Sequence, residues 1–267
     1  MQFRTMPCED AECLVSRLAD RFALLEALAD RDRPKGELEA TLDVSRSTVD
    51  RAVRSLEESG VVTRRGGAVA LTTFGRVALD GYTSFRRGLE ALDRARPMLP
   101  NPEDEATPIP FGFFQGADVV TATRSSPHRP VVAFQQFLQD VDSVESVVTG
   151  ILPEYVRSYR TQVVEADLEA DLVVEPAVLD DLLATYWEPL EEAIETGRVR
   201  IYEAAGTPPA SVKIGSGETT EAALLAYGPQ GVGGFARTTS AEGVRWARSI
   251  VEASRADATL VAPLSES

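Results

Sequence analysis

The sequence predicts an α+β N-terminal domain followed by an α/β C-terminal domain. Three patterns support this prediction: two short helices and a Gly-Gly hairpin within residues 34–71, a proline-rich stretch near residue 100, and alternating strands and helices from residue 117 onward. The chain has 267 residues, 43% of them hydrophobic, which is enough for two cores. We expect domains at residues 1–96 and 111–267, joined by a stiff linker at residues 97–110.

The stretch from Pro34 to Leu71 predicts a winged helix-turn-helix. A helix is expected over Lys35–Leu42, then a tight turn in which Ser45 caps a second helix that begins at Arg46. Beyond that helix, two alternating strands flank Gly66-Gly67, as in a two-stranded wing.

A winged helix binds duplex DNA, so double-stranded DNA is the expected partner. Between Arg33 and Arg76 the chain has eight basic and six acidic residues, and the expected face is therefore not repulsive overall. We expect DNA contacts from the exposed side of the second helix and from the wing, at Ser45, Arg46, Ser47, Thr48, Arg51, Arg54, Arg64 and Arg65.

Two further helices flank this motif. A first helix is expected to cover the core with Leu14, Leu18, Phe22, Leu25 and Leu28. A longer helix over Phe74–Arg96 carries a heptad-like seam that either packs on the first helix or pairs with a second subunit, and we favour a homodimer. The seam consists of Ala78, Tyr82, Phe85, Leu89 and Leu92.

The charge is unevenly distributed along the chain. Residues 1–97 are neutral overall, whereas residues 98–267 carry the whole net charge of −15. Lys35 and Lys213 are the only lysines among 27 basic residues. An acidic surface that is poor in lysine stays soluble at molar salt, which predicts a halophilic archaeal source.

Several classes of protein are disfavoured by the sequence. No apolar run is long enough to span a membrane, and residues 1–10 lack a signal-peptide pattern, so we expect a cytoplasmic protein without membrane contact. Cys8, Cys13 and His128 are too few ligands for a Cys/His zinc site, and we expect no metal or cofactor. The two cysteines are expected to be reduced thiols, with a redox switch as the alternative.

The C-terminal half predicts an α/β layer. Strands are expected at 117–123, 144–151, 170–174, 199–203, 212–214, 222–227 and 232–238, and helices at 129–141, 154–164, 177–197 and 241–256. The turn after the first strand gathers hydrogen-bond donors able to hold a small anion. These are Arg124, Ser125, Ser126, His128 and Arg129. The alternative is that His128 and Arg129 cap the next helix or pair with acids of the linker.

Three motifs resemble one family. They are the Asp-Val-Ser-Arg-Ser-Thr-Val entry at Asp43–Val49, the Pro-His-Arg-Pro turn at Pro127–Pro130, and the Ala-Tyr-x-x-x-Gly hairpin at Ala226–Gly231 followed by Trp246. With them the chain resembles the haloarchaeal winged helix-turn-helix regulators whose C-terminal domain is of the methanogenesis-regulatory (FilR) type. The resemblance implies a transcriptional regulator with a ligand-sensing or assembly domain on a non-catalytic, phospholipase-D-like scaffold.

An enzyme is the weakest interpretation. Phospholipase-D chemistry needs His-x-Lys motifs, but His128 is followed by Arg129 and Pro130. The expected function is thus a sequence-specific transcriptional regulator that senses a small, anionic ligand. The alternative is a DNA-binding assembly adaptor that has no ligand.

Overall fold

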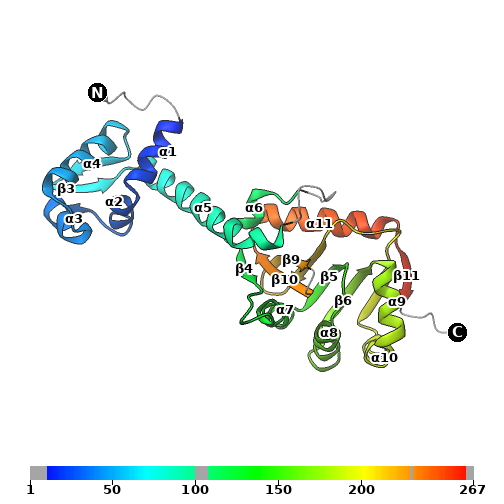
Figure 1. Ribbon diagram of the computed structural model, residues 1–267. Coiled ribbons are helices and arrows are strands. Elements are labelled where there is room, and N and C mark those ends of the chain that lie inside the picture. Colours follow the sequence, from blue (N-terminus) through cyan, green and yellow to red (C-terminus); the bar gives the residue numbers. More distant parts are fainter. Residues whose placement is uncertain (1–10, 100–107, 229–230, 263–267) are drawn as a thin grey trace. The chain divides into compact units, whose positions relative to one another are not determined.

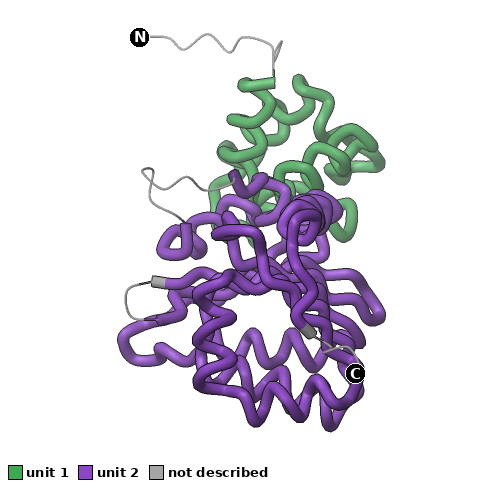
Figure 2. Tube along the Cα trace, turned by 90° about the vertical axis from the view of Figure 1, so that its right-hand side faces the viewer, with its two compact units in different colours: residues 1–86 green, residues 87–267 purple. Residues whose placement is uncertain are grey.

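The computed structural model describes residues 11–99, 108–228 and 231–262. The chain forms two compact units, residues 1–86 and 87–267 (Figure 2). The boundary falls inside helix α5 (Thr73–Ala95), earlier than the linker expected at residues 97–110. The boundary lies there because Ala91, Ala95 and Met98 pack into the core of the second unit. Residues 100–107 of the expected linker lie outside the described residues.

The N-terminal unit combines helices with a three-stranded antiparallel sheet of order β1-β3-β2. Its strands are β1 (Arg33–Pro34), β2 (Val62–Arg65) and β3 (Ala68–Leu71). Its helices are α1 (Ala11–Asp20), α2 (Phe22–Ala27), α3 (Lys35–Leu42), α4 (Arg46–Glu58) and the first part of α5. Their apolar faces meet in one core that includes Leu25, Leu38, Val53 and Leu56.

The single helix expected over residues 14–28 is wrong. Arg21 has φ −119° and ψ 15°, which leaves the helical region and separates α1 from α2. Leu18 before the break and Leu25 after it are both buried in the same core. The spacing of the apolar residues therefore continues across the break and does not reveal it.

The C-terminal unit is built on an eight-stranded mixed sheet of order β11-β7-β6-β5-β8-β9-β10-β4. Only neighbours β5, β6 and β7 are parallel among the described strand pairs, and the other pairs are antiparallel. The strands are β4 (Asp118–Thr121), β5 (Ser143–Val148), β6 (Glu169–Val174), β7 (Val199–Glu203), β8 (Ser211–Ser216), β9 (Thr220–Gly228), β10 (Gly231–Thr238) and β11 (Thr259–Ala262).

Helices cover both faces of this sheet (Figure 1). One face packs on α6 (Phe111–Phe114) and α11 (Ala241–Ala256), with Phe113, Trp246 and Ile250 in its core. The other face packs on α7 (Arg129–Gln139), α8 (Pro153–Glu165), α9 (Pro176–Thr185) and α10 (Trp187–Glu195). Because side chains alternate along a strand, neighbouring residues of β8 belong to different faces. Val212 and Ile214 lie in the α11 core.

The helix expected over residues 177–197 is also wrong, because Tyr186 separates α9 from α10. Pro189 lacks an amide proton, and its ring would clash with the carbonyl group of Thr185 in one continuous helix. Leu183, in the last turns of α9, is 38% exposed. The short elements α6, β1 and β11 were not expected from the sequence.

In the part of the chain that the structure describes, no helix combines the length and apolarity needed to cross a membrane.

Candidate nucleic-acid interface

Helix α4 presents a polar side next to a buried one. The amide of Thr48 donates to Ser45 Oγ at 3.3 Å, so Ser45 caps the helix as expected. Val49, Ala52, Val53 and Leu56 are buried. On the opposite side Thr48 is half-buried, and the other residues expected to contact DNA are exposed: Ser45, Arg46, Ser47, Arg51 and Arg54.

The turn before α4 determines where the polar side of this helix begins. Asp43 adopts the left-handed conformation, with φ 51° and ψ 48°, and ends α3. Aspartate tolerates that conformation better than most residues. The hydroxyl oxygens of Ser45 and Ser47 are 3.0 Å apart, so the first turn of α4 exposes a pair of hydroxyl groups beside Arg46.

One carboxylate shares the polar side of α4. Lys35 forms an ion pair with Asp50 and holds the pKa of Asp50 below its usual value, with smaller contributions from Arg46 and Arg64. Asp50 is therefore ionised at neutral pH, and Lys35 compensates its charge. Arg51 Nε donates to the carbonyl oxygen of Ser47 at 3.2 Å, which leaves its terminal amino groups at the surface.

The hairpin β2-β3 carries two exposed arginines that differ in their contacts. Its tip is Gly66-Gly67, with φ values of +54° and +85° that favour glycine. Arg64 forms an ion pair with Glu57 at the end of α4, with 2.7 Å between Nη2 and Oε2. The side chain of Arg65 forms no ion pair or hydrogen bond with any described residue, and only its backbone pairs with β3. Arg65 is thus the more available of the two arginines.

The seam expected on α5 is divided between the two units. Tyr82 packs against Phe22 with ring centroids 5.7 Å apart, and Ala78 also borders the N-terminal core. Leu92 borders the core of the C-terminal unit. Phe85 and Leu89 lie between Tyr82 and Leu92 along the helix, and their side chains are 44% and 42% exposed. Packing on the N-terminal helices, one of the two alternatives for the seam, therefore applies to Ala78 and Tyr82.

The turn expected to bind an anion lies on the surface of the C-terminal unit. Arg124, His128 and Arg129 are exposed, Ser126 is half-buried, and no described residue forms an ion pair with the three basic side chains. His128 stands at the N-cap position of α7, but its side chain makes no capping hydrogen bond. Because β4 is an edge strand, this turn does not lie at the carboxyl ends of the parallel strands.

A cavity of about 70 Å³ lies instead on the α7–α10 face of the sheet. Its wall includes Val148 and Val174, at the carboxyl ends of β5 and β6, and Lys213 on β8. Lys213 was not among the site residues expected from the sequence. The available signal was the only lysine of the acidic half, placed between Val212 and Ile214 in a strand.

Two family models match the chain. Residues 127–257 match the middle domain of the methanogenesis regulatory protein FilR1, and residues 9–94 match the HVO_A0261 N-terminal domain. The FilR1 match lies within the C-terminal unit, and the other match covers most of the N-terminal unit and continues along α5. These matches support a transcriptional regulator family.

The similarity to other known proteins is low. No curated protein sequence matches the chain. Among solved structures, the archaeal chromatin protein TrmBL2 shares 13% identity over 94% of this chain and 100% of its own, with a TM-score of 0.42. Nuc, a phospholipase D family member from Salmonella typhimurium, shares 8% identity over 54% of this chain and 97% of its own, with a TM-score of 0.40. Such low scores assign neither fold nor function.

Proposed function

We propose that this protein is a sequence-specific, DNA-binding transcriptional regulator. In this proposal the N-terminal unit is a winged helix-turn-helix, α4 is its recognition helix and β2-β3 is its wing. The observation that supports the proposal best is the exposed stripe of Arg46, Ser47, Arg51 and Arg54 on a capped helix whose other side is buried. The two family matches agree with it.

Each part of the surface has a distinct role in this proposal. Arg46, Ser47 and Arg51 lie near the N-terminal end of α4, the end that reaches base edges when a recognition helix enters the major groove. Ser45 and Thr48 at the helix start, Arg54 farther along, and Arg64 and Arg65 on the wing contact the phosphate backbone or the minor groove.

We further propose a homodimer that pairs through Phe85 and Leu89 of α5. These two exposed apolar side chains lie four residues apart, so they are on one face of the helix. A two-fold dimer places two recognition helices on half-sites one helical turn of DNA apart.

The C-terminal unit is proposed to sense a small ligand and to perform no catalysis. The single histidine of the chain, His128, is followed by Arg129 and Pro130 and cannot form a His-x-Lys motif. A ligand changes DNA affinity only if it binds two states of the protein unequally.

Selection of bound sequences from a random pool of duplex DNA tests this function. The full chain is expected to enrich one motif with two inverted half-sites. A chain that enriches no sequence would contradict specific DNA binding. If the chain enriches a motif and its C-terminal unit binds no ligand, the result would favour the assembly adaptor over the ligand sensor.

A further inference from the structure

Lys213 is buried inside the C-terminal unit, although the side chain of lysine is normally exposed. The residue is 2% exposed. Its Nζ donates to Ser211 Oγ at 2.9 Å and to the carbonyl oxygen of Val147 at 3.4 Å, and both acceptors are neutral. No described carboxylate forms an ion pair with it. A lysine ammonium carries three protons, so one donor has no acceptor among the described residues.

A buried charge without a counterion destabilises a fold, and such a group is therefore a candidate for a functional role. Burial lowers the pKa of Lys213 to about 7. Ser211 cannot compensate the charge, because it has no charge of its own and its hydroxyl group already donates to Val147. An anion from outside the protein would supply the missing counterion.

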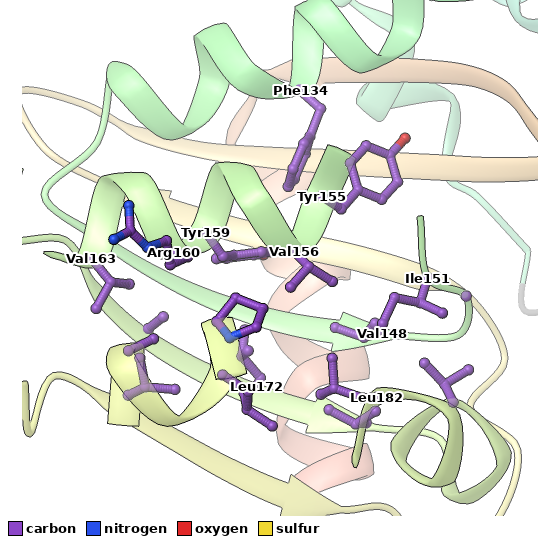
Figure 3. A pocket seen from close by; sticks show the side chains of 18 of the residues that line it. Phe134, Val148, Ile151, Tyr155, Val156, Tyr159, Arg160, Val163, Leu172 and Leu182 are labelled. Atoms are coloured by element: carbon purple, nitrogen blue, oxygen red, sulfur yellow. The ribbon is translucent and has the colours of Figure 1, made fainter. Parts of the chain in front are cut away.

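The cavity beside Lys213 is lined almost entirely by apolar side chains. Figure 3 shows Phe134 and Tyr155 on one side of it and Leu172 and Leu182 on the other. The volume of about 70 Å³ exceeds what one water molecule needs, and so the cavity has room for the body of a small molecule. An apolar wall with one cation favours a ligand that is apolar at one end and anionic at the other.

The other polar groups of the wall are already engaged or turned away. Arg160 pairs with Glu192 at 2.6 Å and with Glu165 at 2.9 Å. Tyr227 donates to the carbonyl oxygen of Gly150 at 2.7 Å, and Tyr159 lies 2.7 Å from Ser146 Oγ. Tyr155 has no hydrogen-bond partner among the described residues, but Figure 3 shows its hydroxyl turned away from Leu172 and Leu182. Lys213 is thus the group that can hold an anion here.

We infer that this cavity binds a small monocarboxylic acid, whose carboxylate pairs with Lys213 and whose apolar body contacts the side chains between the sheet and α8–α10. This site specifies the class of ligand for the sensing role proposed for the C-terminal unit. Binding of the ligand does not depend on that role, whereas an effect of the ligand on DNA affinity does. In this inference the ligand site is the cavity and not the exposed turn of Arg124, His128 and Arg129, which does not line it.

Pairing with a carboxylate favours the protonated form of Lys213, so binding is coupled to its protonation. Above about pH 7 the empty site loses its proton, and the apparent affinity is expected to fall by up to about tenfold per pH unit. The charged and titratable groups around the cavity do not titrate in this range. Arg160 stays charged, and burial raises the pKa values of Tyr155, Tyr159 and Tyr227.

The test compares carboxylates with neutral molecules of the same shape. Acetate, butyrate, hexanoate, benzoate and the neutral benzamide are titrated into the full chain by calorimetry, at pH 6.5 and at pH 8. At least one carboxylate is expected to bind, more weakly at the higher pH, and benzamide is expected not to bind. Lys213→Met should lower the affinity for that carboxylate by about tenfold or more, because the substitution removes a charged hydrogen-bond donor.

Two matched variants locate the site. Arg124→Ala/Arg129→Ala removes two exposed cations elsewhere in the same unit and should leave the affinity unchanged. Ala193 lines the cavity, and Ala193→Leu places a larger side chain in it without changing a charge, which should weaken binding. Circular dichroism verifies the folding of each variant, and Lys213→Gln replaces Lys213→Met if the latter does not fold.

Three results would overturn the site: no carboxylate binds, Lys213→Met binds as tightly as the wild type, or the loss occurs in the arginine variant instead. An electrophoretic mobility assay with the selected DNA distinguishes the proposed carboxylate site from the proposed sensing role. Carboxylate binding without a change in DNA affinity supports the site and contradicts the sensing role.

Discussion

At the scale of single residues, Lys213 makes a prediction about stability. Its pKa falls from 10.5 to about 7 on folding, so between these pH values the unfolded chain binds more protons than the folded one. The free energy of unfolding is therefore expected to rise with pH from about 7 to about 10, by up to about 1.4 kcal/mol per pH unit. Chemical denaturation of the ligand-free protein across this range measures the slope.

Lys213→Met is the control for that slope, since a methionine fills a similar volume without a charge. The variant should be more stable than the wild type at pH 6.5 by a few kcal/mol, and the difference should shrink as the pH rises. Equal pH dependence in both proteins would show that Lys213 does not titrate near pH 7.

Tyr155 makes a second prediction at this scale. Its hydroxyl is buried without a partner among the described residues, which costs about 1–3 kcal/mol in general. Tyr155→Phe removes that hydroxyl group and retains the ring that packs on Phe134 at a centroid distance of 4.5 Å. The free energy of unfolding should rise by about 1 kcal/mol. A loss of stability would show that the hydroxyl group is hydrogen-bonded in solution.

Arg51 is the residue on α4 that we expect to contribute most to base preference. Its Nε donates to the carbonyl oxygen of Ser47, which leaves the two terminal amino groups for a contact with a base edge. Arg51→Ala should weaken binding to the selected DNA by about 1–3 kcal/mol and relax the preference at one position of each half-site. Fluorescence anisotropy with single-base variants of the duplex measures both effects. Recovery of an unchanged motif at unchanged affinity would exclude a base contact.

At the scale of elements, the wing predicts unequal effects of its two arginines. Arg64 must give up or share its ion pair with Glu57 to reach a phosphate, whereas Arg65 has no such pair. Arg65→Ala should therefore weaken binding to all duplexes more than Arg64→Ala, and should lower the slope of log K against log salt by about one. Equal effects, or none across a salt series, would contradict this role of the wing.

Helix α5 predicts the oligomeric state. Phe85→Asp/Leu89→Asp places two carboxylates on the proposed interface, where their burial is unfavourable, and should give a monomer by light scattering. Far-UV circular dichroism verifies that the variant is folded. A dimer that survives both changes would place the interface elsewhere.

Most elements could be predicted from local patterns. The predicted bounds of α3, β7 and α11 coincide with those in the structure. The breaks at Arg21 and Tyr186 were missed because leucines continue at helical spacing on both sides of each. Pro189 was a local signal for the second break. The short strands β1 and β11 were missed because they pair at sheet edges and carry little pattern of their own.

At the scale of the whole molecule, the candidate sites differ in how far they could be predicted. The exposed side of α4 follows from helical periodicity, since Val49, Val53 and Leu56 recur at helical spacing and are buried. The cavity could not be predicted, because its wall combines strands and helices that are distant in sequence. Lys213 lies opposite Ser146 in the pairing of β8 with β5, which no local pattern reveals. The charged turn at Arg124 was conspicuous in the sequence, but it lies on the surface.

The most direct measurement is the affinity of the full chain for its selected duplex. It is compared between two variants that each lose two positive charges. Arg46→Ala/Arg51→Ala removes two exposed arginines from α4, and Arg124→Ala/Arg129→Ala removes two exposed arginines from the C-terminal unit. If α4 reads the DNA, the first variant should lose at least about tenfold in affinity and most of its preference over random duplex, and the second should bind as the wild type does. Equal affinities of both variants and the wild type would contradict α4 as the recognition helix.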